Sequence, residues 1–346
     1  MKVFHGGDVW QDGAPGAYLD FSANLNPEGP PDWVRQAMAE GLERSRFYPD
    51  LKGTAARRGM AAHLRLPEDC VLVTAGGIEA AALAAGLPGD HAIAQPTFQE
   101  YGHLCGTFRD VPRDELATHV FAEGEYLWIC NPNNPTGDAL DRQALLALLD
   151  RAEHAGARLV VDEAFIEYCP EHSVADMVAD HPALIVLGSL TKVLAIPGIR
   201  LGYLAAHPTV QQSLSQRLLP WRLNSVAEAV AEALPGHFAD FEVIRRLNDA
   251  RRAAFAAALC GLGIEVFPSE ANFLLCDFGR DMRPAIATLR AQRILLRPCG
   301  MFPGLTHGHV RLCVRTDAEN GTLERIMEHS IQRSMRIDPQ ETDMIE

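Results

Sequence analysis

Short apolar runs alternate with longer stretches of helical period along the first two-thirds of the chain. The runs are rich in β-branched residues and predict six strands, at residues 71–74, 91–94, 126–130, 158–162, 184–188 and 201–205. The stretches between them are rich in Ala, Leu and Glu and predict helices. Because strands that alternate with helices form a mostly parallel sheet flanked by helices, the sequence predicts an α/β fold.

Clusters of polar residues and glycines directly follow five of the predicted strands. They are Ala75-Gly76-Gly77, Gln95-Pro96-Thr97-Phe98, the stretch 131–137, Asp162-Glu163-Ala164 and Ser189-Leu190-Thr191-Lys192. In open α/β sheets, ligands bind beyond the carboxyl ends of the strands. The sequence therefore predicts that these clusters converge on one ligand site.

The character of the sequence changes after about residue 235. A long helix rich in Arg and Ala is predicted at 240–260, and strand-like runs follow at 272–276 and 310–314. We therefore expect a large α/β domain over residues 31–235 and a smaller α+β domain over residues 236–332.

The two ends of the chain differ from both domains. Residues 1–30 are rich in Gly, Pro and Asn and predict an arm over the surface, whereas residues 333–346 predict a disordered tail. The N-terminus lacks the apolar stretch of a signal peptide, and no window approaches the length of a membrane span. We expect a cytoplasmic protein with no membrane partner.

Charge and cysteine usage narrow the class of function. The 346 residues include 31 basic and 45 acidic ones, a net charge of −14, so no basic stripe is available to neutralise nucleic-acid phosphates. The eight cysteines stand singly, most of them in apolar runs. They predict reduced core residues rather than disulfides or a metal site. We expect a metabolic enzyme that holds no metal and no nucleic acid.

Only three of the 31 basic residues are lysines, at positions 2, 52 and 192. Lys192 lies among apolar neighbours, where an ammonium is poorly solvated, so its pKa should fall. That is the setting of a lysine used as an amine nucleophile. The alternative is a lysine at a helix start whose stem carries the charge out to water.

Residues suited to an anion accompany this lysine. Gly76 and Gly77 join a predicted strand to a helix whose first amides can bind a phosphate, although glycine is common at such turns for steric reasons alone. Ser189, Thr191 and Arg200 add two hydroxyls and a guanidinium. Together they indicate a phosphate held beside an amine-reactive aldehyde.

Two further polar residues suggest an aromatic heterocycle. Asp162 closes an apolar run, where an unpaired carboxylate is costly, and a protonated pyridine nitrogen would be a suitable partner. Asn134 could donate its amide to a phenolic oxygen on the same ring. The alternatives are a helix N-cap for Asp162 and a turn former for Asn134.

The motifs Asn-Pro-x-Asn-Pro-Thr-Gly, Asp-Glu-Ala and Ser-x-x-Lys with a downstream Arg resemble those of pyridoxal-phosphate enzymes of fold type I, the aspartate aminotransferase superfamily. The resemblance extends from about residue 5 to residue 330. Through 46–50 (Arg-Phe-Tyr-Pro-Asp) and 271–273 (Ala-Asn-Phe), the chain is similar to the histidinol-phosphate aminotransferase branch. Through His5-Gly6-Gly7 and 20–27, it resembles more narrowly the threonine-phosphate decarboxylases of cobalamin biosynthesis.

The resemblance implies a set of contacts to pyridoxal 5′-phosphate. Lys192 would hold the cofactor covalently, Asp162 would pair with its pyridinium nitrogen and Asn134 would bond to its ring hydroxyl. The ring would stack on Phe98 or Tyr101, with Phe98 favoured. The cofactor phosphate would be held by Gly76, Gly77, Ser189, Thr191, Arg200 and, from the other subunit of a homodimer, Tyr48.

The resemblance also implies the substrate contacts. Arg311 matches the superfamily's arginine for the substrate carboxylate, beside Asn134. Contacts to a substrate phosphate are implied for His5, Gly6, Asn24 and Arg297.

The implied reaction is the decarboxylation of L-threonine O-3-phosphate, a small amino acid phosphate, to (R)-1-aminopropan-2-ol O-phosphate, which makes the chain a lyase. Phe165 stands where aminotransferases usually have Tyr, a departure that the decarboxylases share. Two alternatives remain: an aminotransferase of the histidinol-phosphate type, and a non-catalytic binding protein of the same fold.

Overall fold

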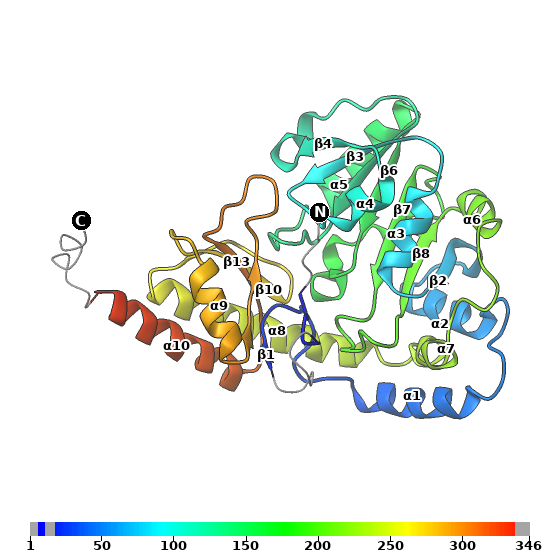
Figure 1. The fold of residues 1–346 in the computed structure, drawn as a ribbon. Coiled ribbons are helices and arrows are strands. Elements are labelled where there is room, and N and C mark those ends of the chain that lie inside the picture. The colour runs from blue at the N-terminus through cyan, green and yellow to red at the C-terminus, as the bar shows by residue number, and fades with distance from the viewer. Residues whose placement is uncertain (1–5, 11–17, 336–346) are drawn as a thin grey trace.

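The computed structural model describes residues 6–10 and 18–335, which contain a seven-stranded sheet and a four-stranded sheet, each with its own helices (Figure 1). The strands are β1 (Leu19–Asp20), β2 (Val71–Thr74), β3 (Asp90–Gln95), β4 (Arg109–Pro112), β5 (Glu125–Cys130), β6 (Arg158–Asp162), β7 (Leu184–Ser189), β8 (Gly202–Ala206), β9 (Glu265–Val266), β10 (Phe273–Asp277), β11 (Ile294–Leu295), β12 (Arg297–Pro298) and β13 (His309–Cys313). The α-helices are α1 (Asp32–Arg44), α2 (Thr54–Leu64), α3 (Gly77–Ala85), α4 (Glu100–Cys105), α5 (Arg142–His154), α6 (Pro208–Ser215), α7 (Ser225–Ala233), α8 (Phe238–Gly261), α9 (Arg283–Ala291) and α10 (Asp317–Met335).

The seven-stranded sheet has the order β2-β8-β7-β6-β5-β3-β4. The six strands expected in this part of the chain are all present, so the predicted α/β class is confirmed. The sequence analysis missed β4, which pairs only with β3 at the edge of the sheet. Three of its four residues are exposed and it ends in proline, so it carries no apolar run that would reveal it.

The sheet is parallel except at β8, which runs antiparallel to both β2 and β7. The predicted mostly parallel sheet is therefore confirmed, with β8 as the antiparallel exception. A parallel neighbour requires a long crossover, usually through a helix, whereas the chain returns from β7 to β8 through residues 190–201 without an α-helix. That returning segment carries Lys192.

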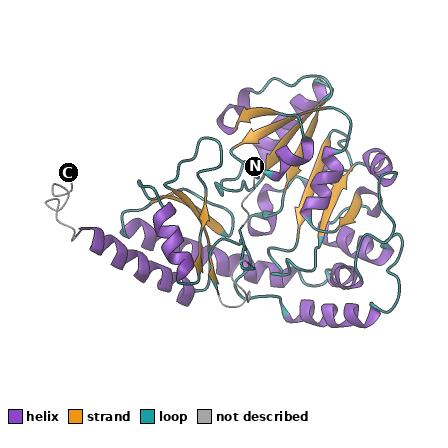
Figure 2. Cartoon of the chain, in the orientation of Figure 1, coloured by secondary structure: helices purple, strands orange, loops and turns teal. Residues whose placement is uncertain are grey.

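Helices cover both faces of the large sheet (Figure 2). Side chains alternate between the faces along each strand, so Leu159 and Val161 of β6 join one apolar cluster while Val160 joins the other. Leu145 of α5 belongs to the first cluster and Ala80 of α3 to the second. With both faces buried, the polar atoms that remain accessible lie at the strand ends.

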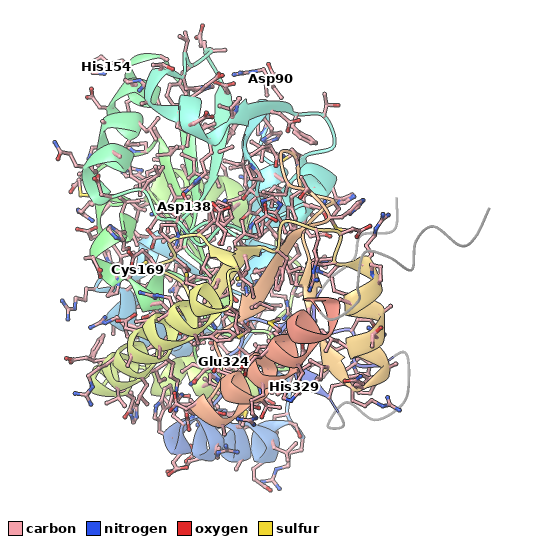
Figure 3. The ribbon with its side chains drawn as sticks, turned by 90° about the vertical axis from the view of Figure 1, so that its left-hand side faces the viewer. Asp90, Asp138, His154, Cys169, Glu324 and His329 are labelled. Carbon is pink, nitrogen blue, oxygen red and sulfur yellow. The ribbon has the colours of Figure 1, made fainter. Side chains whose placement is uncertain are left out.

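The four-stranded sheet has the order β12-β13-β10-β9 and is antiparallel throughout. Its core joins Phe255 of α8, Leu274 of β10, Leu312 of β13 and Leu323 of α10. In the view turned by 90°, α8 and α10 lie side by side along this part of the molecule (Figure 3). The long helix predicted at 240–260 is α8.

Part of the predicted N-terminal arm is built into this second unit. Strand β1 pairs in parallel with β11, and Phe21 is completely buried in the same core as Leu312. The Phe21 carbonyl accepts a hydrogen bond of 2.9 Å from the Cys313 amide. Residues 19–21 are therefore part of the packed small unit and do not lie over a surface.

Two smaller expectations need correction. Helix α10 runs to Met335, so residues 333–335 are helical, whereas 336–346 lie outside the described residues. All eight cysteines are free, but Cys260 is exposed and Cys105 is only partly buried.

Over residues 6–10 and 18–335, no helix is long and apolar enough to cross a membrane, and no group of three or more potential metal ligands lies together.

Candidate active site

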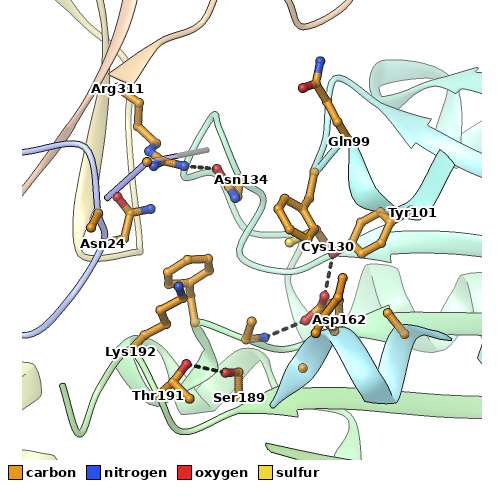
Figure 4. Close-up of a pocket in the computed structure, with 18 of the residues that line it drawn as sticks. Asn24, Gln99, Tyr101, Cys130, Asn134, Asp162, Ser189, Thr191, Lys192 and Arg311 are labelled. Carbon is orange, nitrogen blue, oxygen red and sulfur yellow. Dashed lines mark hydrogen bonds between the residues drawn. The ribbon is translucent and has the colours of Figure 1, made fainter. Parts of the chain in front are cut away.

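The polar clusters meet in one cavity beyond the carboxyl ends of the large sheet, where the small unit closes it (Figure 4). Most of the residues singled out from the sequence line it: Gly6, Asn24, Gly77, Phe98, Tyr101, Asn134, Asp162, Ser189, Thr191, Lys192, Arg200, Arg297 and Arg311. Side chains more than 280 residues apart in the chain thus share one wall of the cavity.

Lys192 lies in the segment that returns from β7 to β8. Burial, together with the nearby Arg311 and Arg200 guanidinium groups, lowers the pKa of its amine to about 8. About half of the amine is therefore neutral at pH 8 and able to act as a nucleophile.

An anion cradle lies beside this lysine. Gly76 has a φ of +84°, and a Cβ there would stand 2.5 Å from Nη2 of Arg200, so only glycine allows the guanidinium to come this close to the turn. Helix α3 begins at Gly77 and presents its first amides. The Ser189 and Thr191 hydroxyls, 2.8 Å apart, complete the cradle.

Asp162 stands at the end of β6 and is buried. The Tyr101 hydroxyl donates a hydrogen bond of 2.6 Å to it, and the Ala164 amide donates another of 2.9 Å. Burial raises the pKa of the Asp162 carboxyl above its ordinary value, although both hydrogen bonds and Lys192 oppose the rise. A cationic ring nitrogen placed against Asp162 would favour its ionised form.

The geometry distinguishes the two aromatic residues offered for ring stacking. Tyr101 is buried with its hydroxyl tied to Asp162, and its ring packs 5.4 Å from that of Trp128. Phe98 meets Tyr101 edge-on at 5.5 Å and is only partly buried beside the cavity. Tyr101 therefore supports the carboxylate, a role that the sequence analysis did not predict, and this favours Phe98 for ring stacking.

Two buried arginines make the opposite wall cationic. Arg297 of β12 and Arg311 of β13 are direct partners in the antiparallel register, and they are 4% and 6% exposed. Burial lowers the pKa of both, that of Arg297 to about 10 with Arg311 as the second cause. Arg311 donates to the Asn134 side-chain oxygen and, at 2.7 Å, to the Ser22 carbonyl. Such a wall favours an anionic ligand.

The N-terminal segment contributes two further predicted residues to the same wall. Gly6 lines the cavity, and so does Asn24, whose buried side-chain oxygen has no hydrogen-bond partner among the residues that the structure describes. His5 lies outside the described residues.

Tyr48 is not brought to the cavity of its own chain. It is 84% exposed and packs 5.2 Å from the Trp221 ring.

The sequence analysis missed Phe302 and Gln99, which also line the cavity. Gln99 donates to the Met301 carbonyl at 3.0 Å and so links the loop between β12 and β13 to the large unit. In the sequence, only the position of Gln99 next to Phe98 indicated that it would line the cavity.

The residues present fit pyridoxal 5′-phosphate. The Gly76 turn, which a Cβ would close, suits a phosphate; Lys192 suits an aldehyde; and Asp162 suits a pyridine nitrogen. No other group need be assumed to account for this donor set, because each chemical feature of the cofactor meets a residue of matching chemistry.

Comparison with known proteins agrees with this fit. The model of the family "Aminotransferase class I and II" matches residues 17–329. A threonine-phosphate decarboxylase of Salmonella typhimurium is 32% identical over 92% of this chain and 94% of its own. A histidinol-phosphate aminotransferase of Aeromonas hydrophila is 35% identical over 75% of this chain and 78% of its own.

Solved structures show the same fold. The L-threonine-O-3-phosphate decarboxylase of Porphyromonas gingivalis matches 90% of this chain and 99% of its own, with a TM-score of 0.82 and 25% identity. A histidinol-phosphate aminotransferase from Sinorhizobium meliloti, solved with pyridoxal 5′-phosphate, matches 90% of each chain with a TM-score of 0.80 and 18% identity. The chain belongs to the aminotransferase class I and II family, whose enzymes use pyridoxal 5′-phosphate, and it has the fold of type I pyridoxal-phosphate enzymes.

Proposed function

We propose that this enzyme decarboxylates L-threonine O-3-phosphate to (R)-1-aminopropan-2-ol O-phosphate, a step of cobalamin biosynthesis. The observation that carries the proposal is the pair of buried arginines, Arg297 and Arg311, on one wall of the cavity. A substrate with both a carboxylate and a phosphate can give each guanidinium its own oxyanion, and each such pair can be bidentate. The similarity to the decarboxylase of Salmonella typhimurium over almost the whole chain supports the same substrate.

The cofactor contacts in the proposal line the cavity, except Gly76, which packs against the cavity residue Arg200, and Tyr48, which would come from the partner subunit. Lys192 holds the cofactor covalently, Asp162 faces its ring nitrogen, Asn134 its ring hydroxyl and Phe98 its ring face. The Gly76-Gly77 turn, Ser189, Thr191 and Arg200 receive its phosphate. When bound, pyridoxal phosphate supplies an electron sink for the substrate carbon attached to nitrogen.

The choice of reaction depends on which bond at that carbon stands perpendicular to the ring, because only that bond overlaps the electron sink. Arg297, with Gly6, Asn24 and His5, would hold the substrate phosphate at the cationic wall. Arg311 would then hold the carboxylate out of the ring plane, so that carbon dioxide leaves. The Lys192 amine would return a proton to the same carbon.

The second candidate is a histidinol-phosphate-like aminotransferase. The observation that favours it is the similarity to the Aeromonas hydrophila enzyme, at 35% identity over three-quarters of this chain. In that case Lys192 would take a proton from the carbon, and an amino group would pass to a keto acid.

The two candidates differ in what they consume. We expect the purified enzyme, supplied with pyridoxal phosphate and L-threonine O-3-phosphate alone, to release carbon dioxide over many turnovers. Histidinol phosphate with 2-oxoglutarate serves as the parallel assay. Turnover that needs 2-oxoglutarate and yields glutamate would replace the decarboxylase proposal by the aminotransferase.

We also propose that the active form is a homodimer in which Tyr48 reaches the partner's phosphate cradle. Tyr48 is exposed and packs on the exposed Trp221 ring, and its chain neighbours Phe47 and Leu51 are exposed apolar residues as well, which favours an interaction surface here. A two-fold interface would let each subunit complete the other's site.

Mixing two impaired variants tests this arrangement. If Tyr48→Phe and Lys192→Ala are each strongly impaired alone, we expect exchange of their chains to restore part of the activity. In a mixed dimer, one site combines the intact Lys192 of one chain with the intact Tyr48 of the other, and this site accounts for the recovery. A fully active monomer by light scattering would contradict the proposal.

A further inference from the structure

Ser22 connects two parts of the cavity wall that come from opposite ends of the chain. It is the second residue after β1, is 2% exposed and lines the cavity between the N-terminal segment 6–8 and Arg311. Its side chain bonds to the N-terminal segment, and its backbone carbonyl bonds to Arg311.

The Ser22 hydroxyl holds the N-terminal segment. Its oxygen accepts a hydrogen bond of 2.8 Å from the Gly7 amide and donates one of 2.6 Å to the Asp20 carboxylate. The same Asp20 oxygen accepts the Ser22 amide at 2.7 Å and the Ala23 amide at 3.2 Å. The hydroxyl is therefore held in one orientation, with a lone pair left for Gly7.

The Ser22 carbonyl holds the substrate arginine. It accepts a hydrogen bond of 2.7 Å from Nη2 of Arg311, inside the protein. Gly6 packs directly on this carbonyl, because a Cβ at Gly6 would overlap its oxygen. The N-terminal segment and the arginine thus both contact the carbonyl of one peptide group.

The residue before Ser22 is anchored to the small unit on both of its backbone polar groups. The Phe21 amide donates to the Leu295 carbonyl at 2.8 Å, and the Phe21 carbonyl accepts from the Cys313 amide at 2.9 Å. Cys313 lies two residues from Arg311 on β13. A shift of Ser22 is therefore transmitted to the strand that carries the arginine.

We propose that Ser22 is a positioning residue that fixes the N-terminal segment 6–8 against the cavity and, through the same peptide group, sets the orientation of Arg311. The proposal rests on the assignment of these residues to substrate binding under the proposed function. It assigns to Ser22 no contact with the reacting atoms.

The test is the variant Ser22→Ala in the cofactor-loaded enzyme. Removing the hydroxyl leaves the Gly7 amide without its acceptor, so we expect faster hydrogen–deuterium exchange of the N-terminal peptide that includes Gly7, in the absence of substrate. We further expect KM for L-threonine O-3-phosphate to rise roughly 5-fold, equivalent to about 1 kcal/mol, with kcat changed less than 2-fold. Ser22→Thr, which keeps the hydroxyl, should restore both quantities.

Ser269→Ala is the matched control. Ser269 is a partly buried serine of the same unit that also accepts a backbone amide, from Ala271, and donates to a second oxygen, but it does not line the cavity. We expect neither quantity to change in this variant. Unchanged exchange in Ser22→Ala, or equal effects in Ser269→Ala, would overturn the proposal.

Two further outcomes are covered by additional measurements. If Ser22→Ala does not fold, Gly6→Ala, which pushes the segment off the Ser22 carbonyl, must show the same faster exchange or the proposal fails. If the wild-type enzyme does not decarboxylate L-threonine O-3-phosphate, the proposed function fails, while the exchange measurement still decides the role of Ser22.

Discussion

Lys192→Ala should leave a folded protein that retains no cofactor after borohydride reduction and has no measurable turnover. The loss of proton transfer alone lowers turnover roughly 10²- to 10⁴-fold, and the loss of the covalent link adds to it. The measurement is the mass of the reduced protein, followed by mapping of the labelled peptide.

The fold should survive this change. Burial lowers the pKa of Lys192 to about 8, below its ordinary value, so the folded state disfavours the ammonium. The resulting cost is fully present below pH 8 and disappears as the pH rises past the ordinary lysine value. In the cofactor-free form at pH 7, the Tm of Lys192→Ala should therefore equal or exceed that of the wild type.

The matched control is Lys52→Ala, which removes an exposed lysine. It should keep both the covalent label and full turnover. A label that persists in Lys192→Ala, on any other residue, would contradict the assignment of Lys192.

Arg297→Ala should raise KM for L-threonine O-3-phosphate roughly 30- to 5,000-fold. That range corresponds to about 2 to 5 kcal/mol, the usual cost of removing one partner of a buried charge-assisted pair. Cofactor retention should not change, because the cradle around Gly76 and Ser189 comes from the large unit. Steady-state kinetics and cofactor absorbance measure the two effects separately.

A substrate without the phosphate sharpens this test. L-Threonine keeps the carboxylate but offers Arg297 no oxyanion, so Arg297→Ala should alter kcat/KM for threonine far less than for its phosphate ester. Arg297→Lys should recover only part of the loss, because an ammonium lacks the bidentate geometry of a guanidinium.

Arg293→Ala controls for charge alone. Arg293 is an exposed arginine of the same unit and does not line the cavity, so KM should stay at the wild-type value. Equal losses for threonine and its phosphate ester in Arg297→Ala would mean that Arg297 does not bind the phosphate.

Much of the large unit could be predicted from the sequence because its signals are local. The apolar run of β6 and the Asp162 that ends it are adjacent in the chain, and the α/β pattern places every such strand end at one edge of the sheet. The apolar surroundings of Lys192 in the sequence likewise predicted its lowered pKa, and burial is the largest cause of that shift in the structure.

The tertiary structure decided the features that depend on register and on packing between distant segments. Nothing near Arg297 in the sequence shows that it is paired with Arg311 across an antiparallel register, or that Ser22 bonds to a guanidinium 289 residues away. Tyr101 and Phe98 are both aromatic residues of one short segment, and only the packing shows that the Tyr101 hydroxyl is bonded to Asp162. Periodicity reports which face of a strand is buried, but the partner across the sheet is set by the turns and the core that bring distant strands together.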